Sequence, residues 1–84
     1  MTTAAKGDPK VLIEYIAKAL VEAPDEVIVD VEQEGETTYV NLEVAESDMG
    51  RIIGRQGRTA KSLRAILNAA GVRHKTHYEL DILD

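Results

Sequence analysis

The sequence predicts an α+β domain with the element order α-β-β-α-α-β, in which three helices cover one face of a three-stranded mixed sheet. Three observations support this prediction. Two neighbouring runs alternate between apolar and polar residues, segments with helical apolar spacing flank them, and a third alternating run follows the last helical segment. The 84 residues are enough for one small domain. We expect residues 1–8 to form a flexible tail and residues 9–84 to form the single domain.

The composition predicts an aliphatic core and excludes several kinds of site. The chain is 44% apolar but has no Trp or Phe and three Tyr, so Val, Ile, Leu and Ala must fill the interior. It has no Cys, which excludes disulfides and thiolate metal ligands. No apolar run is long enough for a signal peptide or a membrane span. We therefore expect a soluble, cytoplasmic protein without membrane contact.

The first helix should begin after Asp8, a good N-cap residue, with Pro9 at its first position, and Pro24 should stop it. Its apolar residues at helical spacing predict the buried face: Leu12, Tyr15, Ile16, Ala19 and Leu20. Tyr15 could stack on a base, but its place in this stripe favours packing in the core.

The two alternating runs predict a β-hairpin around a turn at residues 33–36. One face should be buried and the other wet. The predicted inward residues are Val27, Val29, Val31, Val40, Leu42 and Val44. The wet face is strongly acidic and would repel phosphate, so we exclude it from a nucleic-acid interface. A last strand, with Tyr78, Leu80 and Ile82 inward, is far enough from the hairpin for a parallel crossover.

Two helices should connect the hairpin to the last strand. Ser47 is the predicted N-cap of a short helix that ends near Ile53. A longer helix should run from about Arg58 to Ala70 and end at Gly71. Its apolar arc predicts five core residues: Ala60, Leu63, Ile66, Leu67 and Ala70.

Charge is strongly segregated along the chain. The net charge of −5 by itself argues against a nucleic-acid ligand. However, seven of the ten Lys and Arg residues lie in residues 51–75, and no Asp or Glu occurs in residues 49–78. The molecule should therefore be a strong charge dipole, and its basic part could bind a polyanion.

The loop at residues 54–57, Gly-Arg-Gln-Gly, lies within this basic segment. Glycines allow close approach of the backbone, and the helix start behind them offers free N–H groups to a phosphate. Arg58, Lys61 and Arg64 continue from the loop along one helix face, without acids for i,i+4 pairing. The alternatives are a tight helix connection and an ordinary solvated face. They leave the second glycine and the flanking arginines unexplained.

The run Ile53-Gly54-Arg55-Gln56-Gly57-Arg58, placed between a short and a longer helix, resembles the G-x-x-G loop of KH domains. The element order is that of the type II arrangement. Over residues 9–83 the chain resembles the KhpA family of small bacterial RNA-binding proteins with a single KH domain. The resemblance implies that the loop binds the backbone of about four unpaired nucleotides. One departure is Ala60, where many KH domains carry a bulky apolar residue, and it argues against strong base specificity.

The resemblance also assigns roles to individual residues. The backbone around Arg55, Gln56 and Gly57 would contact phosphates, Ile53 would join an apolar floor, and Ile52 would belong to that floor or to the core. The implied RNA-binding set is Gly54, Arg55, Gln56, Gly57, Arg58, Lys61, Arg51, Ile53 and Arg64. Arg73, His74 and Lys75 are either a second phosphate contact or a plain polar turn. His74 and His77 lack convergent ligands, so we expect no metal.

The resulting hypothesis is a non-enzymatic binder of single-stranded RNA that acts as a chaperone or adaptor with low sequence specificity and without a cofactor. Single-stranded DNA is an alternative ligand. The resemblance implies a larger KH-containing partner of the KhpB type and a link to post-transcriptional control of cell elongation and division. The rival hypothesis is a protein-interaction module that forms homodimers or heterodimers through the loop and helix face. An enzyme is disfavoured because no nucleotide-binding P-loop pattern or nucleophile–base pair is present.

Overall fold

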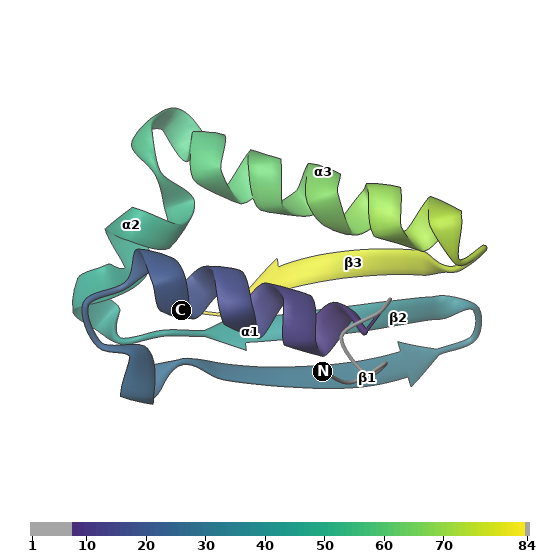
Figure 1. The fold of residues 1–84 in the computed structure, drawn as a ribbon, viewed down its shortest axis with the longest axis horizontal. Coiled ribbons are helices and arrows are strands. Elements are labelled where there is room, and N and C mark those ends of the chain that lie inside the picture. Colours follow the sequence, from purple (N-terminus) through teal and green to yellow (C-terminus); the bar gives the residue numbers. More distant parts are fainter. Residues whose placement is uncertain (1–7, 84) are drawn as a thin grey trace.

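The structure, a computed structural model, describes residues 8–83 (Figure 1). Most of the predicted tail therefore lies outside the described residues. The elements in chain order are α1 (Pro9–Leu20), the 3₁₀ turn η2 (Pro24–Glu26), β1 (Ile28–Glu34), β2 (Thr37–Glu43), the 3₁₀ turn η3 (Glu46–Asp48), α2 (Met49–Ile53), the 3₁₀ turn η4 (Arg55–Gly57), α3 (Arg58–Arg73) and β3 (His77–Ile82). The order α-β-β-α-α-β is the predicted one.

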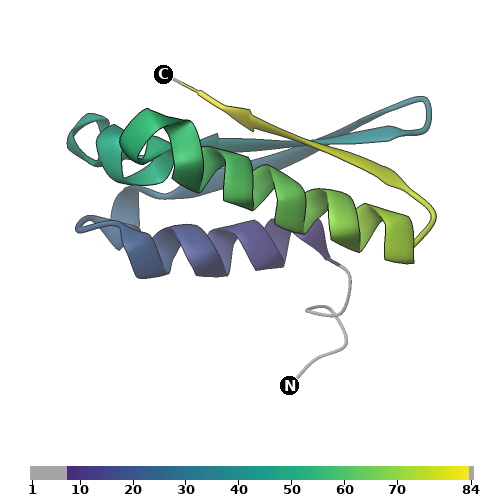
Figure 2. The same ribbon diagram turned by 90° about the horizontal axis from the view of Figure 1, so that it is seen from above.

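The three strands form one mixed sheet in the order β1-β2-β3. β1 and β2 pair antiparallel, with Val29 opposite Leu42, and Gly35 makes the turn between them at a φ of 62°. β2 and β3 pair parallel, with Val40 opposite Leu80. The helices cover one face of this sheet and leave the other face open, as Figure 2 shows from above. The predicted α+β fold, consistent with a type II KH-like domain, is confirmed.

The core is aliphatic, as the composition predicts. The largest fully buried apolar side chains come from all parts of the fold: Ile13, Val40, Leu42, Ile52 and Leu67. Burying each contributes about 1.5–3 kcal/mol of hydrophobic stabilisation. Tyr78 and Leu80 add the inward face of β3. Of the predicted hairpin face, Val31 remains 42% exposed because β1 is an edge strand.

The prediction for the buried face of α1 was right in part: Leu12 and Ile16 pack against the core, whereas Tyr15, Ala19 and Leu20 are exposed. Asp8 caps the helix as predicted, accepting hydrogen bonds from the amides of Lys10 at 2.9 Å and Val11 at 3.4 Å. However, Ile13 and Ala17 face the core, and Tyr15 is 76% exposed. The helix is apolar around most of its circumference, so apolar spacing alone did not determine its rotation. Tyr15 therefore does not pack in the core.

Two helix boundaries also differ from the sequence-based expectation. α1 ends at Leu20, before Pro24, which instead begins the 3₁₀ turn η2. Ser47 is not the cap of α2, because it lies within η3 and α2 begins at Met49. Short 3₁₀ turns precede both β1 and α2, and cap-residue patterns do not distinguish them from helix starts.

The predicted end of the longer helix at Gly71 was wrong, because α3 continues to Arg73. A Cβ atom on Gly71 would lie 2.5 Å from the Thr76 carbonyl oxygen, so this glycine serves the close approach of the segment leading into β3. The left-handed residue after the helix is Lys75, with a φ of 56°. Ala60, Leu63 and Leu67 are buried as predicted, whereas Ile66 is 42% exposed at the margin of the apolar arc.

Candidate nucleic-acid interface

The loop of residues 54–57 connects α2 to α3 and projects at one end of the helical layer (Figure 1). Its backbone is left-handed at three of four positions. The φ angles are 80° at Gly54, 57° at Gln56 and 76° at Gly57. Gly54 combines its φ with a ψ of 170°, a region that is essentially restricted to glycine. Three of the four loop residues thus have backbone angles that favour glycine.

The two glycines are required for different reasons. A Cβ atom on Gly54 would overlap the Thr59 side chain and lie 2.8 Å from the Thr59 amide nitrogen. A Cβ atom on Gly57 would meet nothing within 4 Å, so that position needs glycine for its φ alone. Gln56, the one non-glycine residue of the three, carries the cost of a left-handed conformation.

The loop leaves two amides for a ligand. The Gly57 amide already donates to the Gly54 carbonyl oxygen at 3.1 Å, and the Arg58 amide donates to the Arg55 carbonyl. In residues 8–83, the Arg55 and Gln56 amides donate none of the backbone hydrogen bonds that close loops and caps. Of the three backbone groups expected to face phosphates, Arg55 and Gln56 therefore remain the candidates, and the Gly57 amide has an internal acceptor.

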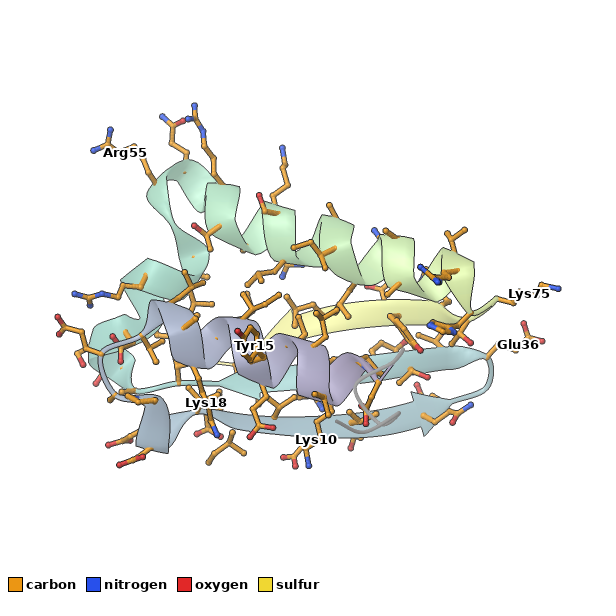
Figure 3. The ribbon with its side chains drawn as sticks, in the orientation of Figure 1. Lys10, Tyr15, Lys18, Glu36, Arg55 and Lys75 are labelled. Atoms are coloured by element: carbon orange, nitrogen blue, oxygen red, sulfur yellow. The ribbon has the colours of Figure 1, made fainter. Side chains whose placement is uncertain are left out.

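Four cations lead from the loop along α3. We call Arg55, Arg58, Lys61 and Arg64 the basic ridge; all four side chains are exposed. Within the described part of the chain, none of them forms an ion pair with a carboxylate. Figure 3 shows the Arg55 side chain extending away from the domain at the loop tip. The ridge therefore presents charge that no carboxylate of residues 8–83 pairs with.

Arg51 has a different environment, although the resemblance assigned it to the RNA-binding set. Its guanidinium lies 3.1 Å from the Glu22 carboxylate and 3.2 Å from that of Asp48. These two acids belong to the segment after α1 and to η3, so Arg51 joins α2 to both. Its charge is partly neutralised, and any contact with phosphate competes with this pairing.

Asp48 is the buried centre of this cluster, and sequence reasoning missed it. The side chain is 1% exposed and accepts hydrogen bonds from the Glu22 and Ala23 amides, both at 3.1 Å, besides the bond from Arg51. The Glu22 amide is the largest cause that lowers the pKa of this carboxyl below its ordinary value. Burial opposes that effect, and the Ala23 amide and Arg51 add to it. The one signal in the sequence for the ion pair between Asp48 and Arg51 is their spacing of three residues, which places both side chains on the same side of a helical turn.

Of the apolar residues beside the loop, some belong to the core and one keeps exposed surface at the candidate interface. Ile52 is completely buried and belongs to the core. Ile53 is half-buried, so it keeps surface beside the loop for the predicted apolar floor. Ala60, in the first turn of α3, is 4% exposed. A small residue at this place provides little apolar surface to a base.

Arg73, His74 and Lys75 lie at the far end of α3 from the loop. Figure 3 shows Lys75 and Arg55 at opposite ends of the molecule, with Glu36 of the hairpin turn on the same side as Lys75. The 16 residues of α3 between them correspond to a helix of about 24 Å. The structure thus separates this cluster from the loop. Its role in phosphate binding stays an untested alternative.

Comparison with known proteins identifies the family. Residues 10–82 match the family model described as the KH domain of KhpA/KhpB. The chain belongs to this family. It is 47% identical over 75 residues to the RNA-binding protein KhpA of Halalkalibacterium halodurans, covering 89% of this chain and 99% of that protein. The KhpA of Borreliella burgdorferi is 41% identical over 78 residues, covering 93% and 95% of the two chains.

A solved structure shows the same KH-like fold within a larger protein. The chain matches part of Aquifex aeolicus Era, bound to GDP and AlF4⁻, with a TM-score of 0.59 and 15% identity. The match covers 88% of this chain and 29% of that one, and at this identity it supports the fold alone. The KhpA/KhpB KH domains are a non-enzymatic family, which agrees with the sequence-based expectation.

In residues 8–83, no three His, Asp or Glu side chains gather as metal ligands would, and His77 instead lies 2.8 Å from Glu79. None of the described helices combines the length and the apolar character that a membrane crossing needs.

Proposed function

We propose that this KhpA-family domain binds single-stranded RNA by its backbone, with the loop of residues 54–57 as the clamp and the basic ridge as the electrostatic track. The observation that carries the proposal is the basic ridge itself, four exposed cations without acidic partners that begin at the left-handed loop. The curated relatives are named RNA-binding proteins, which supports RNA as the polyanion.

The clamp acts through two kinds of contact. The Arg55 and Gln56 amides would donate to phosphate oxygens, and the Arg55 guanidinium would add a charge-assisted contact. Arg58, Lys61 and Arg64 would follow the strand along α3. These contacts are made to the backbone, which carries no sequence information. The domain thus binds with low sequence specificity, as a chaperone or adaptor does.

A single strand suits this loop better than a duplex, because G-x-x-G loops of KH domains clamp the backbone of about four nucleotides of an unpaired strand. Single-stranded DNA offers the same phosphates and is the comparison ligand. No aromatic side chain stands on the basic ridge, so stacking, worth about 1–3 kcal/mol per base, does not add to affinity there.

Weak binding by one domain favours a second RNA-binding module. Two linked or associated modules gain avidity because the second contact is made at a high effective concentration. A larger KH-containing protein of the KhpB type fits this role and rests on the family relationship. The proposed setting is cytoplasmic, where such a complex would act in post-transcriptional control of cell elongation and division.

The test replaces Arg55 and Gln56 with Asp, which changes the charge by −3 at the loop. The matched control replaces Arg73 and His74 with Asp, which makes the same charge change at the far end of α3. Fluorescence anisotropy with a labelled single-stranded RNA should show loss of binding for the loop variant and near-normal binding for the control. Equal losses in both variants would mean that net charge, and not the loop, governs binding.

The same variants distinguish RNA binding by the loop from the rival role of the loop in binding a protein partner. Their urea unfolding curves should match that of the wild type, because the exchanged side chains are exposed. RNA binding that survives in the loop variant would exclude the clamp. Loss of a protein partner with RNA binding retained would assign the loop to protein contacts instead.

A further inference from the structure

Asp48 stands at the N-cap position of α2 but does not cap that helix. An aspartate at this position usually accepts hydrogen bonds from the first amides of its own helix. Among the described residues, Asp48 accepts from no amide of α2, and its two oxygens instead accept from the Glu22 and Ala23 amides, each at 3.1 Å. These two residues lie between α1 and η2. The buried carboxylate therefore joins two segments that are distant in sequence.

The short helix α2 depends on such support. It has five residues, and isolated helices shorter than about 12–15 residues are marginal in water. Ile52 is fully buried and fixes one side of the helix in the core. Arg51 ties the helix to Asp48 at 3.2 Å and to Glu22 at 3.1 Å. Figures 1 and 2 both place α2 at the end of the molecule where α1 ends. The orientation of α2 is therefore set partly by the Asp48 contacts.

The loop of residues 54–57 begins where α2 ends. The Gly54 amide donates to the Gly50 carbonyl oxygen at 2.8 Å, so the first loop residue is hydrogen-bonded to α2. A tilt of α2 would move Gly54, and with it the Arg55 and Gln56 amides that follow. Hydrogen bonds weaken steeply when their distance and angle change. The fit of these amides to a phosphate therefore depends on the position of α2.

We propose that Asp48 is a positioning residue of the RNA-binding site, which holds α2 against the segment after α1 and thereby sets the position of the loop. This role rests on the proposed function of the loop. Asp48 is 1% exposed, so it acts through α2 and does not touch the RNA. When α2 is loosened, a smaller fraction of the molecules has the loop in its binding position, and the apparent RNA affinity falls by that fraction.

The test compares Asp48→Asn with Glu22→Gln. Each variant removes one carboxylate beside Arg51 and changes the net charge to −5 + 1 = −4, so charge alone would raise RNA affinity in both. In Asp48→Asn, an NH₂ group replaces one acceptor oxygen, and one of the two backbone amides loses its partner. Glu22→Gln leaves both amide bonds in place. Fluorescence anisotropy with a labelled single-stranded RNA should show an affinity about five-fold lower for Asp48→Asn, if about one molecule in five keeps the loop in position. Glu22→Gln should not lower the affinity.

Two further readouts separate positioning from direct contact and from loss of stability. Removing a phosphate contact makes the slope of log affinity against log salt shallower by about 0.7, whereas Asp48→Asn should leave the slope at least as steep as in the wild type. Val40→Ala is the control for stability, because Val40 is fully buried in the central strand β2. It should bind RNA as the wild type does. Both variants are compared in trimethylamine N-oxide, which favours the folded state.

Hydrogen exchange reports the position of α2 without RNA. Loss of global stability speeds the exchange of all core amides, whereas local loosening speeds only the amides of the loosened segment. The Gly54 amide, whose acceptor is the Gly50 carbonyl, should therefore exchange faster relative to the sheet amides in Asp48→Asn than in Val40→Ala.

An Asp48→Asn variant that binds RNA as tightly as the wild type, or more tightly, overturns the positioning role. A shallower salt slope, an equal loss of affinity in Val40→Ala, or unchanged relative exchange at Gly54 also overturns it. These results leave the proposed function intact, because that function is tested by replacing Arg55 and Gln56. If RNA binding survives those replacements, the proposed function fails. Faster exchange at Gly54 in Asp48→Asn would then still show that Asp48 holds α2.

Discussion

Thr59 occupies the space that a side chain on Gly54 would need. A Cβ atom on Gly54 would overlap the Thr59 hydroxyl and Cβ, and would lie 2.8 Å from the Thr59 amide nitrogen. The first turn of α3 therefore packs directly against the first residue of the loop. This contact links the conformation of the proposed clamp to the start of the helix that carries the basic ridge.

The first prediction compares Gly54→Ala with Gly57→Ala. A left-handed conformation costs an alanine about 1–2 kcal/mol, and both variants incur this cost. Gly54→Ala should destabilise the domain further, because its backbone region is essentially glycine-only and its Cβ meets backbone as well as side-chain atoms. Urea unfolding measures the difference. Equal stability losses would contradict the role given to Thr59.

A second pair of glycines should respond with opposite signs. A Cβ atom on Gly50, in α2, meets nothing within 4 Å, so Gly50→Ala should raise stability by about 0.5–1 kcal/mol through helix propensity. Gly71→Ala should lower it by about 1–3 kcal/mol, because its Cβ would lie 2.5 Å from the Thr76 carbonyl oxygen. Both changes are read from chemical denaturation curves. A stabilised Gly71→Ala variant would mean that the segment into β3 moves freely.

These glycines also show what the sequence could predict. The loop glycines were recognised because their spacing and basic neighbours form a local pattern, and the strands because alternation determines which side is buried. The local pattern at Gly71 predicts a helix end, since it cannot show that the Thr76 carbonyl approaches from the segment leading to another strand. Its requirement for glycine comes from a contact outside the helix.

The same limit explains the errors at Tyr15 and Asp48. α1 is apolar on most sides, so its rotation depends on what the sheet and α3 present to it, and Ile13 faced the core in place of Tyr15. Asp48 is held by amides that lie 25 and 26 residues earlier in the chain. The Arg55 end of the candidate site, by contrast, is local in sequence, because its residues follow one another along one loop and one helix.

The third prediction concerns the acid sensitivity of the fold. The pKa of Asp48 is lowered from 3.8 in the folded state, mainly by the Glu22 amide, so its ionised form is stabilised by folding. That stabilisation is complete above the unfolded pKa and is lost as the pH falls through the folded pKa. The stability difference between wild type and Asp48→Asn should therefore be constant near neutral pH and shrink below about pH 4. Urea unfolding at several pH values tests this. A difference that does not change with pH would exclude Asp48 as the group responsible.

The fourth prediction is the salt dependence of RNA binding. If three of the four ridge cations contact phosphates at the same time, the slope of log affinity against log salt should be roughly −2 for a single strand. Arg58→Gln should make the slope shallower by about 0.7, because one contact is lost. The matched change Arg73→Gln, at the far end of α3, should leave the slope unchanged. Titrations at several salt concentrations provide these values, and a wild-type slope near zero would remove the electrostatic mechanism.

The last prediction asks whether Arg51 joins the interface when it is released. Glu22 lies 3.1 Å from its guanidinium at an exposed position, so Glu22→Gln should free part of that charge for phosphate. RNA affinity should rise by about two-fold, in keeping with the 0–1 kcal/mol typical of a surface ion pair. Glu26→Gln is the matched control. Glu26 is exposed in η2, and its substitution removes the same charge as Glu22→Gln.

A combined variant decides between a local and a general effect. If Arg51 acts directly, the gain from Glu22→Gln should disappear when Arg51→Gln is added, while the Glu26→Gln control stays at wild-type affinity. A gain of equal size in the control would mean that lower net charge alone strengthens binding. A gain that persists without Arg51 would leave this arginine as a structural link between α2 and the segment after α1, held by Glu22 and Asp48.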